Sequence, residues 1–182
     1  MRLDAQANRE RILAAAEAVF GEHGEGGSTE DVARLAQVGI ATVFRHFPTK
    51  HALIEATVLR HFAMLTTRAQ ALAAHSDPAR ALRTLLRLMI ETGATKIALL
   101  AMLRDGDALP ASATTASLQL RDAVEVVLRR AQSALVVRRS VAVDEVYLLV
   151  RGLAQASATV RPAPKTLRRA ADIVFAGLTD KP

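Results

Sequence analysis

Apolar residues recur at helical spacing along nearly the whole chain, and no segment alternates between apolar and polar residues as a strand does. The first such pattern predicts a helix over residues 7–22, which ends where glycines begin to accumulate. Its apolar positions are Ile12, Ala16, Val19 and Phe20. The glycine-rich segment 24–27 that follows predicts a loop.

The next two predicted helices are short and lie close together in the sequence. Ser28 precedes Asp31 by three residues, a capping-box pattern that predicts a second helix running to about residue 36. Residues 37–39 interrupt it, and a third helix is predicted over residues 40–46. Pro48 stops this helix because a residue before proline avoids the helical conformation.

The rest of the chain also predicts helices. Thr49 can cap a fourth helix that continues to about residue 74, and Asp77 with Pro78 marks the start of a fifth. The later segments are predicted as helices over 78–92, 94–104, 113–138, 144–159 and 165–178, with a loop at 105–110. We therefore expect an all-α fold, with an N-terminal three-helix domain over residues 1–48 joined to a C-terminal helical domain over residues 49–182.

The second and third helices, joined by a very short turn, predict a helix-turn-helix, in which the second of the pair enters the DNA major groove. Val43 and Phe47 are four residues apart and can face the core. Thr42 and Arg45 can bond to bases or phosphates, although Thr42 can equally bond its own helix and Arg45 can simply be solvated. Ile40 can either belong to the core or contact the DNA. The outward positions are Ile40, Ala41, Thr42, Phe44, Arg45 and His46.

At this point the chain resembles the TetR family of transcriptional regulators. The resemblance covers about residues 9–56 and includes the segments RILAAA at 11–16, VFGEHG at 19–24 and STEDVA at 28–33. Its most specific part is TVFRHFPTK at 42–50, followed by Leu53 and Ile54. Two turn positions depart from the family pattern, since Gln37 stands where glycine is usual and Gly39 where serine or another capping residue is usual.

The resemblance implies specific roles for several residues in DNA binding. Lys50 and Thr29 would contact phosphates, and Arg2, Arg9 and Arg11 would assist as a flexible arm. Phe44 stands where the family usually has a tyrosine, so it lacks the hydroxyl that commonly bonds a phosphate. The full set expected to contact a double-stranded DNA operator is Thr29, Ile40, Ala41, Thr42, Phe44, Arg45, His46 and Lys50.

Net charge, cysteine content and the length of apolar runs limit the classes of function that the chain can have. The formal net charge is +6, but residues 1–62 hold seven Lys and Arg against eight Asp and Glu, so charge does not itself point to DNA. The absence of cysteine excludes disulfides and thiolate chemistry. The longest strongly apolar run, residues 97–103, is too short to span a bilayer, and no signal peptide is recognisable, so we expect a cytoplasmic protein without membrane contact.

The resemblance also implies a ligand-responsive repressor that works as a homodimer. A small-molecule effector is expected to bind in the C-terminal helices, near Met64, Met89, Ile90, Met102, Leu103 and Tyr147, although each of these can instead be ordinary core. Apolar faces on the last two helices are expected to form a four-helix bundle between subunits. These positions are Val143, Val146, Tyr147, Val150, Leu153, Leu167, Ala170, Ala171, Val174 and Leu178; the alternative is that both faces pack on their own subunit.

The two other classes of function are an enzyme and a helical interaction protein. An enzyme is not expected, because the chain has no cysteine, no Glu-x-x-His pair and no glycine-rich phosphate loop. No cofactor or metal site is expected either, since His46, His51 and His61 lack the spacing of four residues that a helical metal site uses. The alternative to a repressor is a helical interaction protein that has lost specific DNA binding.

Overall fold

The structure, a computed structural model, describes residues 2–104 and 108–179, and side chains from Asp4 onward. In these ranges all regular secondary structure is helical, and isolated bridges such as that between Val137 and Thr179 form no strand, so the expected all-α class is confirmed. The chain divides into two compact units. One comprises residues 1–61 with 95–114, and the other comprises residues 62–94 with 115–182. The predicted loop at 105–110 falls partly outside the described residues.

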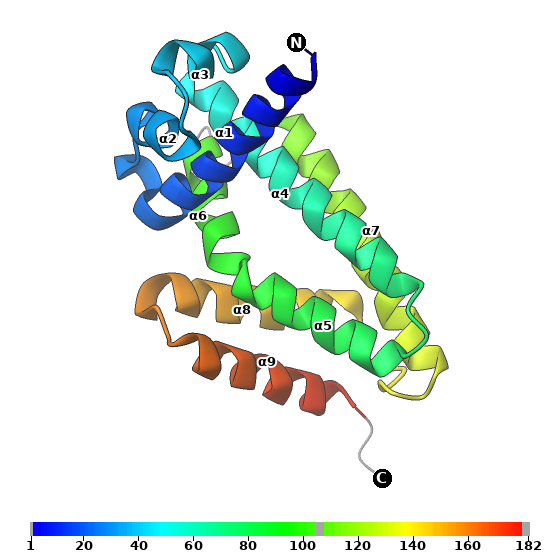
Figure 1. The fold of residues 1–182 in the computed structure, drawn as a ribbon. Coiled ribbons are helices and arrows are strands. Elements are labelled where there is room, and N and C mark those ends of the chain that lie inside the picture. The colour runs from blue at the N-terminus through cyan, green and yellow to red at the C-terminus, as the bar shows by residue number, and fades with distance from the viewer. Residues whose placement is uncertain (1, 105–107, 180–182) are drawn as a thin grey trace. The chain divides into compact units, whose positions relative to one another are not determined.

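The first unit holds the N-terminal helices (Figure 1). It contains α1 (Arg2–His23), the 3-10 turn η1 (Gly24–Gly26), α2 (Thr29–Ala36), α3 (Ile40–His46), the start of α4 (Lys50–Ala73) and most of α6 (Gly93–Leu103). Because Arg9 and Arg11 lie inside α1, the expectation that they belong to a flexible arm is wrong. Arg2 lies outside the described side chains.

The first unit extends past the boundary that we expected at residue 48, because the start of α4 and part of α6 pack with the N-terminal helices. A β-carbon built on Gly21 of α1 would lie 2.7 Å from Cγ2 of Thr95 of α6, so glycine permits a close approach between these helices. The core is formed by buried side chains from all of these elements. They include Ile12, Leu13, Ala16, Phe20, Val32, Val43, Phe47, Leu53, Ile54, Leu99 and Leu103.

The second unit contains the rest of α4, α5 (Pro78–Glu91), most of α7 (Ala111–Ser133), α8 (Val143–Val160) and α9 (Pro164–Leu178). Helix α5 contacts both α8 and α9 (Figure 1). It starts as the sequence predicts, with the Asp77 carboxylate accepting from the Arg80 amide and Pro78 in the first turn. Its apolar face, which includes Leu82, Leu85, Leu86, Met89 and Ile90, is buried.

Polar contacts also join α5 to α9. The Arg87 guanidinium donates to both carboxylate oxygens of Asp172 over 2.7 Å. This pairing lowers the pKa of the Asp172 carboxyl below its usual value. The Arg83 guanidinium lies 4.6 Å from the ring centroid of Phe175, which is a favourable cation–π distance. These contacts fix the register between α5 and α9.

Helix α7 ends at Ser133, five residues before the end that we predicted at 138. Leu135 adopts a left-handed conformation with φ of 57°, and the amide of Val136 donates back to the carbonyl of Ala131. The chain then pairs with the end of α9 through the Arg138 amide and the Leu178 carbonyl oxygen. The prediction was too long because neither glycine nor proline marks this helix end.

The apolar faces predicted to join two subunits are partly internal to one subunit. Val143, Val146 and Val150 of α8 are at most 8% exposed, as are Ala171 and Leu178 of α9. These side chains have little free surface in one subunit, because α8 and α9 pack on their own unit, and their part in a subunit contact stays a prediction. Tyr147, Leu153, Leu167, Ala170 and Val174 are half-buried, and their part in a contact stays a prediction.

Within the ranges that the structure describes, no helix combines the length and apolar character needed to cross a bilayer.

Candidate nucleic-acid interface

The N-terminus of α2 is fixed by the capping box that the sequence predicts. The Asp31 amide donates to the Ser28 hydroxyl oxygen over 3.0 Å, and the Ser28 amide donates to the Asp31 carboxylate over 3.3 Å. The Ser28 hydroxyl also donates to the same carboxylate over 2.7 Å. This hydroxyl is the main reason that the pKa of Asp31 lies below its usual value. The interaction sets where α2 begins.

The turn between α2 and α3 depends on an unusual backbone conformation at Gln37. Its φ of 56° and ψ of 46° are left-handed, which costs a non-glycine residue about 1–2 kcal/mol. The amide of the next residue, Val38, donates to the carbonyl of Ala33 over 3.0 Å and closes the helix end. Gly39 is extended and precedes α3 without a side-chain cap. The turn is therefore formed despite both departures from the family pattern.

Helix α3 has one buried side and one exposed side. Val43 is fully buried and Phe47, directly after the helix, is 4% exposed, as the spacing predicts. The exposed positions are Ile40, Ala41, Phe44 and Arg45, while Thr42 and His46 are half-exposed at the margins. Because Ile40 is 36% exposed, it does not belong to the core of the protomer. The exposed residues of this seven-residue helix thus form a short outward face that combines apolar groups and one cation.

Lys50 and Thr29 make contacts within the unit that the sequence did not suggest. The Lys50 ammonium donates to the carbonyl oxygens of Gly27 over 2.6 Å and of Glu25 over 3.2 Å, and it lies 5.5 Å from the Phe20 ring centroid. Thr29 is 8% exposed, and its hydroxyl donates to the Glu30 carboxylate over 3.2 Å. Their expected phosphate contacts stay predictions.

Arg9 of α1 lies next to the end of α3. Its guanidinium is 5.4 Å from the ring centroid of Phe47, and its side chain is 46% exposed. It also pairs with Glu10 over 3.7 Å. Arg9 therefore places a cation beside the outward helix from a fixed helical position rather than from a flexible arm.

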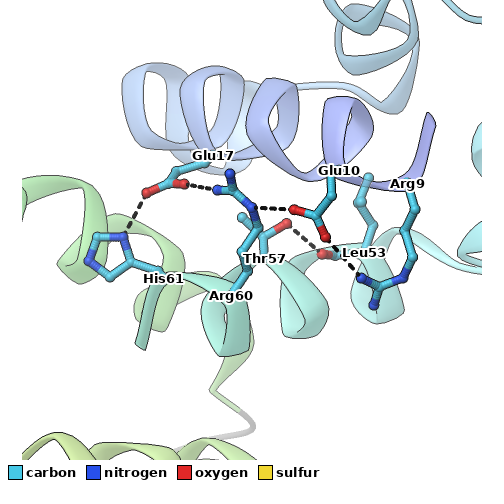
Figure 2. A network of polar contacts seen from close by, with 7 residues as sticks. All are labelled: Arg9, Glu10, Glu17, Leu53, Thr57, Arg60 and His61. Carbon is cyan, nitrogen blue, oxygen red and sulfur yellow. Dashed lines mark hydrogen bonds and ion pairs between the residues drawn. The ribbon is translucent and has the colours of Figure 1, made fainter. Parts of the chain in front are cut away.

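A polar network that the sequence analysis missed joins α1 to α4 (Figure 2). The Arg60 guanidinium of α4 donates to Glu10 over 3.1 Å and to Glu17 over 2.7 Å. The next residue on α4, His61, places Nδ1 2.7 Å from the other Glu17 oxygen. Glu10 and Glu17 are seven residues apart and so share one face of α1, which is the only sequence signal for this network.

Glu17 is the centre of this network. The hydrogen bond with His61 is the largest cause of its lowered pKa, and partial burial acts in the opposite direction. His61 is 1% exposed, whereas the Glu17 side chain is 21% exposed, so the pair reaches from the interior of the unit toward its surface. Thr57, one turn earlier on α4, is also buried and satisfies its hydroxyl by donating to the Leu53 carbonyl over 2.7 Å. These contacts hold α4 against the helices that carry the outward face.

The six residues expected near an effector fall into both units. Met102 and Leu103 belong to the first unit, and Met64, Met89, Ile90 and Tyr147 belong to the second. Met89, Ile90 and Leu103 are buried, as core residues are. A groove of about 620 Å³ in the second unit contains none of the six; among its lining residues are Arg138, Glu145, Leu149, Ile173 and Gly177.

Tyr147 differs from the other five because it has a buried polar atom. Among the residues that the structure describes, its hydroxyl has no hydrogen-bond partner. Burial raises the pKa of this hydroxyl to about 12, so the group is neutral and able to donate at physiological pH. A buried hydroxyl without a partner costs about 1–3 kcal/mol. In the same described ranges, no group of three or more side chains is arranged to hold a metal ion.

Comparisons with known proteins agree with the geometry. Residues 12–57 match the model of bacterial regulatory proteins of the tetR family, and residues 77–180 match the model of the C-terminal domain of SbtR-like transcriptional regulators. A search of curated proteins found no match.

Solved structures extend the likeness over the whole chain. A TetR transcription regulatory protein from Mycobacterium vanbaalenii is 30% identical, with a TM-score of 0.79 and coverage of 98% of this chain and 99% of that one. The TetR transcriptional regulator SCO0520 from Streptomyces coelicolor is 31% identical, with a TM-score of 0.80 and coverage of 96% and 99%. This chain therefore belongs to the TetR family of DNA-binding transcriptional regulators.

Proposed function

We propose that this protein is a ligand-responsive repressor that binds a palindromic operator as a homodimer. The observation that carries the proposal is the two-sided character of α3. Val43 and the adjoining Phe47 anchor the helix in the core, while Ile40, Phe44 and Arg45 remain exposed. A helix that is anchored on one side and bare on the other is suited to the major groove.

In the proposed complex, α3 contacts base edges and its neighbours contact the DNA backbone. Arg45 is the one exposed cation on α3 and can donate to guanine or to phosphate. In the sequence, Arg9 precedes the helix-turn-helix and Lys50 follows it. Both residues supply phosphate contacts. Lys50 retains one N–H in addition to those that bond Gly27 and Glu25.

A dimer is needed because one short helix covers too few base pairs to select a site in a genome. We place the subunit contact on the outward sides of α8 and α9, which form exposed stripes of apolar and small residues. Leu149, Gly152 and Ala156 follow helical spacing on α8, and Ile173 and Gly177 do so on α9. Leu149 is 42% exposed and Ile173 is 71% exposed. A second copy of the chain is the proposed occupant, since two such helices from each subunit form a four-helix bundle.

Effector binding is proposed for the C-terminal helices, with Tyr147 as a polar contact. Its neutral, unpartnered hydroxyl would donate to an acceptor on the effector. The methionines Met64 and Met89 would adapt to the apolar part of that molecule, since thioether side chains fill irregular spaces. Effector binding would then reduce the affinity for DNA.

The proposed function is tested by titrating the purified protein against a labelled duplex from the region upstream of its own gene. We expect saturable binding with two protomers per palindromic site and a strong decrease in affinity as salt is raised. An unrelated duplex of equal length is the control. Equal binding to both duplexes would contradict a repressor and favour a helical interaction protein that has lost specific DNA binding.

A further inference from the structure

We propose that α3 recognises thymine methyl groups through Ile40 and Phe44, so that each operator half-site carries thymines at the base pairs facing these two residues. This inference rests on the proposed function, because it takes α3 to be the helix in the major groove. It adds the chemical class of base that the helix selects.

The exposed face of α3 is largely apolar. Ile40 is 36% exposed and Phe44 is 42% exposed. They are four residues apart, so they lie side by side on the helix, with Ala41 beside them. Arg45 is the one fully charged residue among the exposed positions of α3. The face is therefore an apolar stripe with a cation at its edge.

The chemistry of the major groove leaves one apolar feature for such a stripe to contact. Guanine, cytosine and adenine present hydrogen-bond acceptors and donors there, whereas thymine also presents its C5-methyl group. An apolar side chain pressed against a donor or acceptor would remove water from it without replacing the hydrogen bond, which is costly. Ile40 and Phe44 are thus best matched by thymine methyls.

The identity of residue 44 supports this match. A phenylalanine ring has no hydroxyl with which to bond a phosphate oxygen, so its exposure cannot be explained by a polar contact to the DNA backbone. In the proposed complex, a ring on the exposed side of α3 can instead pack against a methyl group. Thr42 and Arg45 supply the polar contacts that fix the register.

The experiment begins by selecting bound duplexes from a random pool with the full-length protein. We expect enrichment of a palindrome whose half-sites contain thymines at fixed positions. Each thymine is then replaced by deoxyuridine, which removes the methyl group but keeps base pairing and all groove donors and acceptors. We expect two such positions per half-site. Replacing the thymine at one of them in both half-sites removes two methyl groups and is expected to weaken binding about tenfold.

Side-chain variants connect each methyl group to its residue. Ile40→Ala and Phe44→Ala should each bind the thymine site more weakly and should each become insensitive to uracil at one position. Leu118→Ala is the matched control, because Leu118 is a 57% exposed leucine on α7, outside the helix-turn-helix. It should retain wild-type affinity and sensitivity. Circular dichroism confirms that all three variants remain helical.

The outcomes separate the inference from the proposed function. A selected palindrome without such thymines would overturn the inference alone. The inference would also be overturned if the wild-type protein bound every uracil-containing duplex as tightly as the thymine duplex. The same holds if both α3 variants remained sensitive to uracil. Failure to enrich any duplex would contradict the proposed function and the inference together.

Discussion

The ammonium group of Lys50 donates to the carbonyl oxygen of Gly27 over 2.6 Å. This contact joins the first residue of α4 to the segment directly before α2, and a second bond to Glu25 reinforces it. Family resemblance assigns Lys50 to a phosphate, but its contacts within the unit give it a structural role as well. Lys50 therefore links the stability of the helix-turn-helix to its affinity for DNA.

Lys50→Ala should lower both stability and DNA affinity. Loss of a charged donor from two carbonyl oxygens is expected to cost about 1–2 kcal/mol in the free energy of unfolding, measured by urea denaturation. DNA affinity should fall for all sequences alike, with a smaller salt dependence. Lys165→Ala, at an exposed position in the first turn of α9, is the control and should change neither quantity. Unchanged stability in Lys50→Ala would refute the structural role.

The Glu17 network predicts a specific dependence of stability on pH. Because the folded pKa of Glu17 is lowered, mainly by the hydrogen bond with His61, its contribution is fully present above the unfolded value near 4.5. It is lost as the pH falls through the lower folded value. Glu17→Gln should therefore be less stable than wild type at neutral pH, and the difference should shrink in acid.

Urea denaturation at a series of pH values measures this dependence. Glu25→Gln is the control, because Glu25 is an exposed carboxylate in η1. It should be close to wild type throughout. A constant difference between wild type and Glu17→Gln from neutral to acid pH would show that the carboxylate charge does not stabilise the fold.

Tyr147→Phe should leave the protein equally stable or more stable, by at most about 1–3 kcal/mol. The substitution keeps the ring and removes a buried hydroxyl that has no partner among the described residues, so its desolvation cost disappears. Thermal unfolding measures the change. A loss of more than about 1 kcal/mol would mean that the hydroxyl is hydrogen-bonded in the free protein, and it would weaken the proposed effector contact.

Leu149→Arg combined with Ile173→Arg should yield monomers that bind the operator weakly. Both side chains are exposed in the protomer, so the charges are tolerated within one subunit but not between two apolar faces. Light scattering at micromolar concentration measures the mass, with Leu118→Arg as the control on α7. A dimeric double variant, or a monomeric wild type, would contradict the proposed contact.

The helix-turn-helix was predictable because its signals are local. The Ser28–Asp31 capping box and Pro48 mark helix ends within a few residues of sequence, and the spacing of Val43 and Phe47 defines the buried side of α3. The end of α7 was missed because Leu135 adopts a left-handed conformation that no local sequence signal predicts.

The contacts between helices were less predictable because they depend on tertiary structure. The pattern containing Val146 and Val150 indicates which side of α8 is buried, but it does not say whether the partner is α5 or another subunit. Similarly, Arg60 contacts residues more than forty positions away on α1, and nothing in its own neighbourhood identifies Glu10 and Glu17 as partners.

The central claim, that α3 reads base sequence, is tested most directly by comparing wild type and Arg45→Ala on a set of single-base variants of the bound duplex. We predict that Arg45→Ala folds normally, binds the best duplex more weakly, and loses about 1–3 kcal/mol of discrimination at one base pair per half-site. Arg168→Ala, which removes an exposed arginine from α9, should keep the wild-type profile. An identical base-preference profile for Arg45→Ala and wild type, with equal affinity, would contradict the account.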